Sequence, residues 1–184
     1  MIMKNNLSRQ LNALGALALS LVLGYAFYSQ IVEDILACPL CLLQRVGFIA
    51  VMFGLLCNII FGPRMLHYSA MIMGAMLGAA IALRQMSLHF IPGTPGYGAP
   101  FLGMHFYTWA FVTFAVIIFG TAIMMAFSSQ YEKVKYVPFS MQSGIAKIAI
   151  IAVLLMTAGN MLNAFAECGP YECPGDPVSY WLFR

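Results

Sequence analysis

The stretch "CPLCLLQRVGFIAVMFGLLCNIIF", residues 38–61, joins a Cys-x-x-Cys pair to a long apolar run. From residue 42 onward this run carries a single formal charge, on Arg45. A helix needs roughly 20 apolar residues to cross the hydrocarbon core of a bilayer, and this run has that length. The stretch therefore predicts a membrane-spanning helix that has a dithiol at its first turn and an arginine soon after it.

The whole chain shares this apolar composition. Of its 184 residues, 62% are hydrophobic and only 8% are charged, whereas soluble domains carry about 25% charged residues. The formal net charge of +3 is too small to indicate nucleic-acid binding, and no linker or long repeat divides the sequence. We therefore expect one integral membrane domain over residues 1–184.

Five apolar runs are long enough to span a membrane, and segments with turn-forming residues separate them. The predicted fold is all-α, with a four-helix transmembrane bundle and a fifth transmembrane helix. The predicted spans cover residues 11–32, 42–61, 65–90, 105–127 and 144–166, and a C-terminal tail follows over residues 167–184.

The basic residues predict the orientation of the chain in the membrane. Lys and Arg concentrate on the cytoplasmic flanks of membrane helices. With the N-terminus inside, six of the nine basic residues fall on cytoplasmic flanks, and the opposite orientation would place most of them outside. We therefore expect an N-in, C-out protein. The six residues are Lys4, Arg9, Arg64, Lys133, Lys135 and Lys147.

The five cysteines form two pairs and one single residue. Cys38 and Cys41 follow the first predicted span, and Cys168 and Cys173 follow the fifth. In the expected orientation both pairs face the non-cytoplasmic side, where disulfides persist. Cys57 lies in the middle of the second span, and we interpret it as a small apolar core residue.

The positions of Cys41 and Arg45 indicate redox chemistry at the membrane boundary. Cys41 stands at a helix start, where free backbone N–H groups and the helix dipole favour the thiolate. Arg45 lies four residues later on the same helix face. It either snorkels toward lipid phosphate or holds the polar head of a ligand beside the sulfur, with Gln44 as a further hydrogen-bonding group. A quinone suits the second interpretation, because its carbonyl oxygens need donors as they gain electrons.

The stretch "CPLCLLQR", residues 38–45, resembles the Cys-x-x-Cys-x-x-x-Arg signature of the bacterial DsbB-type disulfide bond formation proteins. Two less specific stretches support it, "LRQMSLHFIP" at 83–92 and "FLGMHFYTWAFV" at 101–112, and the resemblance covers about residues 10–127. It implies a bacterial inner-membrane bundle that passes electrons from a periplasmic, thioredoxin-fold oxidase of the DsbA type to ubiquinone or menaquinone.

The resemblance also implies roles for individual residues. Cys41 would face the quinone, and Arg45 would position and polarise it. Cys38 would exchange with a second cysteine pair. His89 would take the place of the family's quinone-side histidine, with a polar interfacial role as the alternative.

The chain departs from this family in the position of its second cysteine pair. Members normally hold that pair between the third and fourth spans, but residues 91–104, "IPGTPGYGAPFLGM", contain no cysteine. We expect this Gly- and Pro-rich segment either to fold over the quinone site or to cap the bundle. Cys168 and Cys173 would replace the missing pair on a tail that folds back over the first loop. The alternative is a structural disulfide that pins the tail.

Several residues predict helix packing rather than chemistry. Asn160 and Asn163 share one face of the fifth span and are expected in interhelical hydrogen bonds. Gly74 and Gly78 suggest a close helix crossing in the third span. The aromatic residues expected to anchor the tail at the membrane interface are Tyr180, Trp181 and Phe183.

The function predicted from these features is that of a protein-dithiol:quinone oxidoreductase. The first alternative is a metal-binding membrane protein with a Cys₄ zinc site, which would leave Arg45 without a role. The second is a small transporter with structural disulfides, although the spans lack the paired ionisable residues and internal repeats of transporters. We expect no bound metal.

Overall fold

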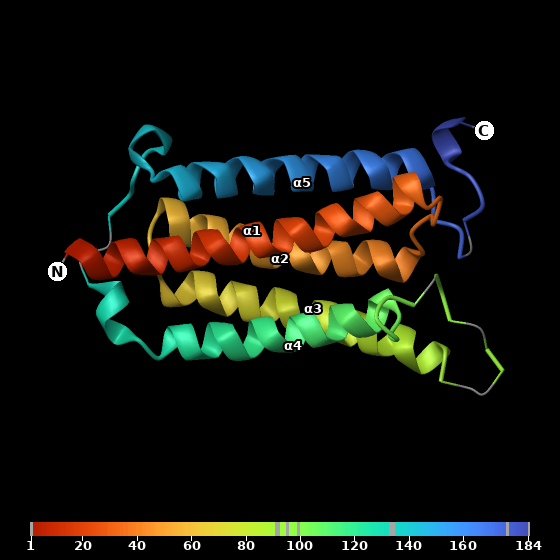
Figure 1. Ribbon diagram of the computed structural model, residues 1–184, viewed down its shortest axis with the longest axis horizontal. Coiled ribbons are helices and arrows are strands. Elements are labelled where there is room, and N and C mark those ends of the chain that lie inside the picture. The colour runs from red at the N-terminus through yellow and green to blue at the C-terminus, as the bar shows by residue number, and fades with distance from the viewer. Residues whose placement is uncertain are drawn as a thin grey trace.

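Five long helices lie side by side and form the body of the molecule (Figure 1). The computed structural model describes residues 2–90, 93–94, 96–98, 100–132, 135–175 and 177–183, with the backbone alone for residues 2–6. Each long helix is long and apolar enough to cross a membrane, which confirms the predicted all-α membrane fold. The helices are α1 (Ile2–Val32), α2 (Pro39–Ile60), α3 (Met65–Leu88), α4 (Phe106–Met125) and α5 (Gly144–Cys168). The short 3-10 helices are η1 (Ser128–Tyr131), η2 (Phe139–Met141) and η3 (Trp181–Phe183).

Helix α2 begins three residues before its predicted span, and this places the cysteine pair at its first turn. Pro39 occupies the first helical position, where its fixed φ fits the helix and its missing N–H is not needed. The sulfur of Cys38 caps the helix by accepting a hydrogen bond from the Cys41 backbone N–H at 3.1 Å. Cys41 is therefore part of the helix, and the helix geometry fixes the direction in which its side chain points.

Helix α5 runs two residues beyond its predicted span and ends with Cys168. Gly169 terminates it with a φ of 66°, a left-handed conformation that favours glycine. The chain then turns sharply, so Cys173 comes back to the end of the helix.

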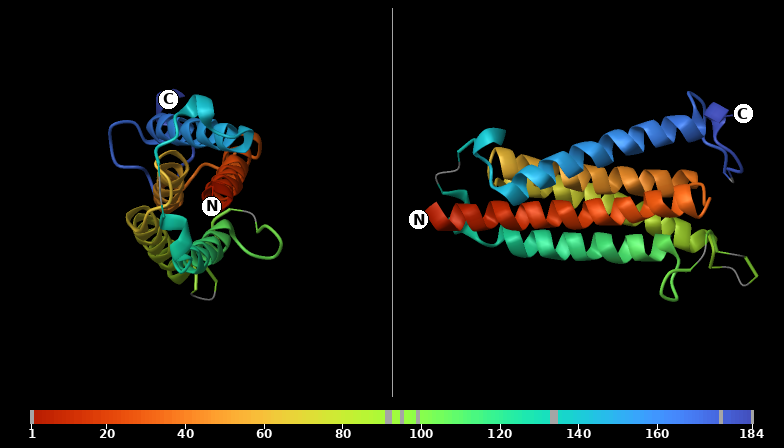
Figure 2. Two further views of the ribbon diagram at one scale, coloured as in Figure 1. Left: turned by 90° about the vertical axis from the view of Figure 1, so that its left-hand side faces the viewer. Right: turned by 45° about the horizontal axis from the view of Figure 1, so that its top comes forward.

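The helices pack in a defined order. Helix α2 packs against α3, α3 packs against α4, and α1 packs against both α2 and α5. Viewed along the helices, α5 lies beside α1 on the side of the bundle away from α4 (Figure 2, left). The fifth helix is thus added to the outside of a four-helix bundle.

The predicted close crossing at the third span is confirmed. A Cβ atom at Gly78 would lie 2.2 Å from the ring of Phe114, and one at Gly74 would lie 2.9 Å from the Cβ of Ala50. Phe114 in turn stacks on Phe48, with ring centroids 4.1 Å apart. The two glycines therefore let α2, α3 and α4 approach closely. Cys57, predicted as a core residue, is half-buried and belongs to neither disulfide.

Both cysteine pairs lie at one end of the bundle, together with the connection between α3 and α4 (Figure 1). The N-terminus, the loop between α2 and α3 and the connection from α4 to α5 lie at the other end. Two of the residues used to predict the orientation, Lys133 and the side chain of Lys4, lie outside the described part of the chain.

Candidate functional site

The first disulfide, Cys38–Cys41, is held by two glutamines. Its Cα atoms are 5.0 Å apart. The side-chain amide of Gln85, from α3, donates toward Cys38 Sγ at 3.2 Å and toward Cys41 Sγ at 3.4 Å. Gln44 Nε2 donates to Gln85 Oε1 at 2.7 Å, which fixes the orientation of that amide. Because Gln85 is 1% exposed, these contacts are shielded from competing water.

The second disulfide, Cys168–Cys173, packs against the region of the first. Cys168 forms a buried cluster with Ala37, from the loop between α1 and α2, and with Leu42 of α2. Cys41 and Cys173, both partly buried, pack against this same cluster. The tail therefore folds back over the first loop, as the sequence predicted, and the two disulfides share one apolar cluster.

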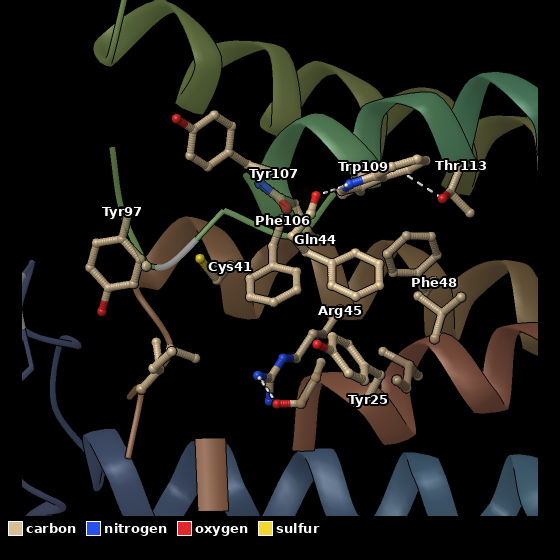
Figure 3. A pocket seen from close by; sticks show the side chains of 18 of the residues that line it. Tyr25, Cys41, Gln44, Arg45, Phe48, Tyr97, Phe106, Tyr107, Trp109 and Thr113 are labelled. Carbon is tan, nitrogen blue, oxygen red and sulfur yellow. Dashed lines mark hydrogen bonds between the residues drawn. The ribbon is translucent and has the colours of Figure 1, made fainter. Parts of the chain in front are cut away.

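A cavity of about 420 Å³ lies beside the first disulfide, between α1, α2 and α4. Cys41, Gln44 and Arg45 project from α2 on one side of it, and Trp109 of α4 lies opposite (Figure 3). Most of the remaining lining is apolar. Its aromatic lining residues are Tyr25, Phe48, Tyr97, Phe101, Phe106, Tyr107 and Trp109.

The connection between α3 and α4 folds over this cavity. The Tyr97 hydroxyl donates to the Leu36 carbonyl oxygen at 2.7 Å and so ties the connection to the first loop. Phe101 and Met104 form a tight turn with reciprocal backbone hydrogen bonds of 2.8 and 3.1 Å, and Trp109 Nε1 donates to the Phe101 carbonyl at 2.9 Å. The described residues of this segment therefore lie over the cavity instead of only capping the end of the bundle.

A second hollow of about 350 Å³ continues along the bundle toward the N-terminal end. Its lining includes residues of α1 and α4 along much of their length, and it shares Val22 and Thr113 with the first cavity. The two hollows together form an apolar trough between α1 and α4.

Arg45 is buried inside the bundle, with 9% of its surface exposed. Its Nη1 donates to Gln30 Oε1 at 2.8 Å, and its Nη2 donates to the Ala26 carbonyl oxygen at 3.2 Å. The guanidinium also lies over the ring of Phe27, 5.5 Å from its centroid. These contacts to α1 hold the charge at the cavity wall, which argues against the snorkelling interpretation.

His89, the other residue predicted near the ligand, is not part of the cavity wall. Its Nδ1 lies 2.9 Å from the Gln85 carbonyl oxygen. Its ring stacks on Tyr107 at a centroid distance of 5.3 Å, and Tyr107 stacks on His105 at the same distance. Tyr107, which lines the cavity, is thus in contact with both histidine rings.

Polar residues that the sequence analysis did not single out complete the site. Gln30 of α1 is 1% exposed and Glu167 of α5 is 2% exposed. Gln30 Nε2 donates to Glu167 Oε2 at 2.8 Å. These two residues and Gln85 are polar side chains in or next to apolar runs. Such side chains usually pair with another polar group inside the protein. The sequence does not say which partner each one has.

The two asparagines of α5 differ in their contacts. Asn163 Nδ2 donates to Gln30 Oε1 at 3.0 Å, which confirms the predicted interhelical bond. Asn160 does not follow the prediction, because its Nδ2 donates to the Met156 carbonyl oxygen of its own helix at 2.7 Å. One turn separates the two residues, and only Asn163 reaches the level of Gln30.

Residues 8–97 match the family described as disulfide bond formation protein DsbB. Disulfide bond formation protein B of Nitrosomonas eutropha is 34% identical over 80 residues, which cover 41% of this chain and 49% of that protein. Disulfide bond formation protein B 1 of Pseudomonas aeruginosa is 36% identical over 88 residues, which cover 46% of this chain and 54% of that protein.

The chain thus spans about half the length of the curated relatives that it matches. The family match includes residues 8–32 of α1, all of α2 and α3, the first disulfide and Arg45, whereas α4, α5 and the second disulfide lie outside it. No solved structure matches the chain.

Proposed function

We propose that this chain, whose residues 8–97 match the DsbB family, is a protein-dithiol:quinone oxidoreductase of the bacterial inner membrane. Its task is to reoxidise a periplasmic DsbA-like thiol oxidase and to pass the electrons to the membrane quinone pool. One observation carries the proposal. The Cys38–Cys41 disulfide borders an apolar cavity that also holds the buried guanidinium of Arg45.

The proposed orientation is N-in and C-out, with both disulfides at the periplasmic face. The distribution of charge supports it, because basic residues gather at the end of the bundle opposite the disulfides. Those with described side chains are Arg9, Arg64, Lys135 and Lys147. This end has the character of a cytoplasmic face.

The cavity suits a quinone ring in shape and chemistry. A flat, apolar ring with two carbonyl oxygens fits aromatic walls that have hydrogen-bond donors at one end. Arg45 would hold the ring, since its guanidinium has five N–H donors and, among the described residues, two of its nitrogens bond to Gln30 and the Ala26 carbonyl. Gln44 and the sulfur of Cys41 line the same wall. When bound, ubiquinone or menaquinone supplies a two-electron, two-proton acceptor.

The shared cluster of the two disulfides supports a relay. In this proposal a thiolate of the reduced partner attacks Cys168–Cys173 and forms a mixed disulfide, which the partner's second thiolate resolves. The tail thiolates then reduce Cys38–Cys41 by the same exchange. Two partner thiols become a disulfide, and the two electrons reduce Cys38–Cys41 to a pair of thiols. A DsbA-type oxidase has a potential of about −120 mV, so only a strongly oxidising acceptor drives this flow.

The test is anaerobic quinone reduction by the purified protein, supplied with a reduced DsbA-type oxidase. Wild type, Cys41→Ser and Cys168→Ser/Cys173→Ser are compared. We expect turnover in the wild type and its loss in both variants. If the tail variant stays active while Cys41→Ser does not, the tail disulfide is structural and the partner attacks Cys38–Cys41 directly. An inactive wild type, with active quinone and partner controls, would refute the proposed function.

A further inference from the structure

A continuous chain of hydrogen bonds connects the fifth helix to the cavity. Glu167 Oε2 of α5 accepts from Gln30 Nε2 of α1 at 2.8 Å. Gln30 Oε1 accepts from Arg45 Nη1 of α2 at 2.8 Å. All three side chains are at least nine-tenths buried, and Arg45 borders the cavity. The chain thus crosses three helices between the C-terminal end of α5 and the ligand wall.

The chemistry of the three groups gives this chain a direction. An ionised carboxylate only accepts hydrogen bonds, and a guanidinium only donates them. The amide of Gln30 serves both neighbours in one orientation alone, with its NH₂ toward Glu167 and its oxygen toward Arg45. Asn163 donates to the same amide oxygen at 3.0 Å and reinforces this orientation. A change at Glu167 is therefore transmitted to Arg45 through the Gln30 amide.

The chain also joins opposite charges within the bundle. A buried guanidinium is costly in a membrane protein unless a negative group or several acceptors compensate it. Gln30 joins the two charged groups, because its side-chain amide bonds to both of them. Besides Gln30, the Glu167 carboxylate meets the backbone of Ala37 in the first loop. Burying a carboxylate costs free energy unless hydrogen bonds and an opposite charge compensate it, and here the opposite charge is that of Arg45.

We propose that Glu167 is a positioning residue of the quinone site, acting on Arg45 through Gln30. Through the Gln30 amide, its carboxylate keeps the guanidinium aimed along the cavity wall. The inference rests on the proposed function and extends it, because it makes α5 a required part of the quinone site. Helix α5 lies outside residues 8–97, so the match to the DsbB family does not include this contribution.

Quinone binding tests the proposal without relying on turnover. Trp109 lines the cavity, and a bound quinone quenches a nearby indole. In full-length protein carrying Trp181→Phe, the fluorescence of Trp109 reports the binding of decylubiquinone, a short-chain ubiquinone analogue. Glu167→Gln preserves the size of the side chain and its acceptor for Gln30 but removes the charge. We expect it to weaken quinone binding about tenfold, as for the loss of one charge-assisted interaction.

Glu172→Gln is the matched control. Glu172 is an exposed carboxylate on the same tail, and its neutralisation changes the net charge equally. We expect no change in its quinone affinity. Equal affinities for wild type, Glu167→Gln and Glu172→Gln would overturn the positioning role, whereas a wild type that does not bind decylubiquinone would refute the proposed function itself.

Two double variants separate positioning from a general effect on folding. Gln30→Glu/Glu167→Gln exchanges the carboxylate and the amide, which restores both hydrogen bonds and the charge. We expect it to recover most of the affinity lost in Glu167→Gln. Gln30→Ala/Glu167→Gln should bind no more weakly than Gln30→Ala, because Glu167 acts only through Gln30. Additive losses, or an exchange that restores thermal stability but not binding, would show that Glu167 is merely structural.

In steady-state turnover the same role has a second signature. Glu167→Gln should raise the KM for quinone and leave the KM for the reduced partner oxidase unchanged. A rise in both constants would contradict a role confined to the quinone site.

Discussion

At the scale of single residues, an uncharged amide group contacts both sulfurs of the disulfide next to the cavity. Gln85 directs N–H groups at both sulfurs of the Cys38–Cys41 pair, and Gln44 holds its oxygen. Donors of this kind stabilise a thiolate more than a disulfide sulfur. Gln85 is therefore expected to make the pair more oxidising.

Replacing Gln85 by Leu tests this effect. The variant keeps the volume of the side chain but loses the N–H donors, so the reduced pair is destabilised. We expect the reduction potential of Cys38–Cys41 to fall by about 30 mV, a tenfold change in the equilibrium constant. Redox titration against glutathione or dithiothreitol measures it, with Gln10→Leu, at an exposed position of α1, as the control. An unchanged or higher potential would contradict the role of Gln85.

The guanidinium of Arg45 predicts a second residue-scale result. Its two nitrogens reach Gln30 and the Ala26 carbonyl in a fork that the single ammonium of lysine does not reproduce. We expect Arg45→Lys to raise the KM for quinone about tenfold. Steady-state kinetics at saturating reduced partner measures this change. A variant with wild-type KM would show that the charge alone suffices.

Sequence spacing could identify Cys38, Cys41 and Arg45, because all three lie within two turns at the start of one helix. It could not predict that Gln30 would bond to both Arg45 and Glu167. Gln30 and Glu167 are 137 positions apart, and only the packing of α5 on α1 joins them. For His89 the sequence correctly predicted a position near the end of α3. It could not predict that the ring would stack on Tyr107.

At the scale of the elements, α2, α3 and α4 depend on the small size of Gly78. Its hydrogen atoms face the ring of Phe114, which has no exposed surface and stacks on Phe48. The sequence predicted a close crossing from the spacing of Gly74 and Gly78. It did not identify the aromatic ring on the other side.

Gly78→Ala is therefore expected to destabilise the bundle. Its new Cβ would lie 2.2 Å from Phe114, and overpacking of this kind costs about 1–3 kcal/mol. Gly120→Ala in α4 is the matched control, because a Cβ there meets no atom within 4 Å. Thermal unfolding in detergent should show a lower Tm for the first variant and a wild-type or higher Tm for the second. Equal Tm values would mean that Phe114 moves aside freely.

At the scale of the whole molecule, the five spans followed from hydropathy, because each is apolar along its length. Their lateral order did not follow, since an apolar helix presents a similar surface in every direction. Hydropathy therefore gave no sign that α5 would join α1 on the outside of the bundle, or that a trough would lie between α1 and α4.

The proposed orientation makes a prediction for the molecule as a whole. Val178, 84% exposed on the tail, and Ser140, exposed in η2, lie at opposite ends. In intact spheroplasts, a membrane-impermeant maleimide should label Val178→Cys and should label Ser140→Cys only after lysis. The reverse pattern would contradict the N-in, C-out topology.

The trough between α1 and α4 has a consequence for kinetics. Because α5 packs against α1 and α2, the added helix does not cover the trough between α1 and α4 (Figure 2). A hydrophobic acceptor that enters here diffuses in two dimensions and never passes through water. The concentration that governs its binding is then its mole fraction in the bilayer. Adding inert lipid to proteoliposomes would therefore slow turnover, even when the amounts of acceptor and protein stay fixed. Under the proposed function, the rate of disulfide formation would therefore follow the concentration and redox state of the quinone in the bilayer.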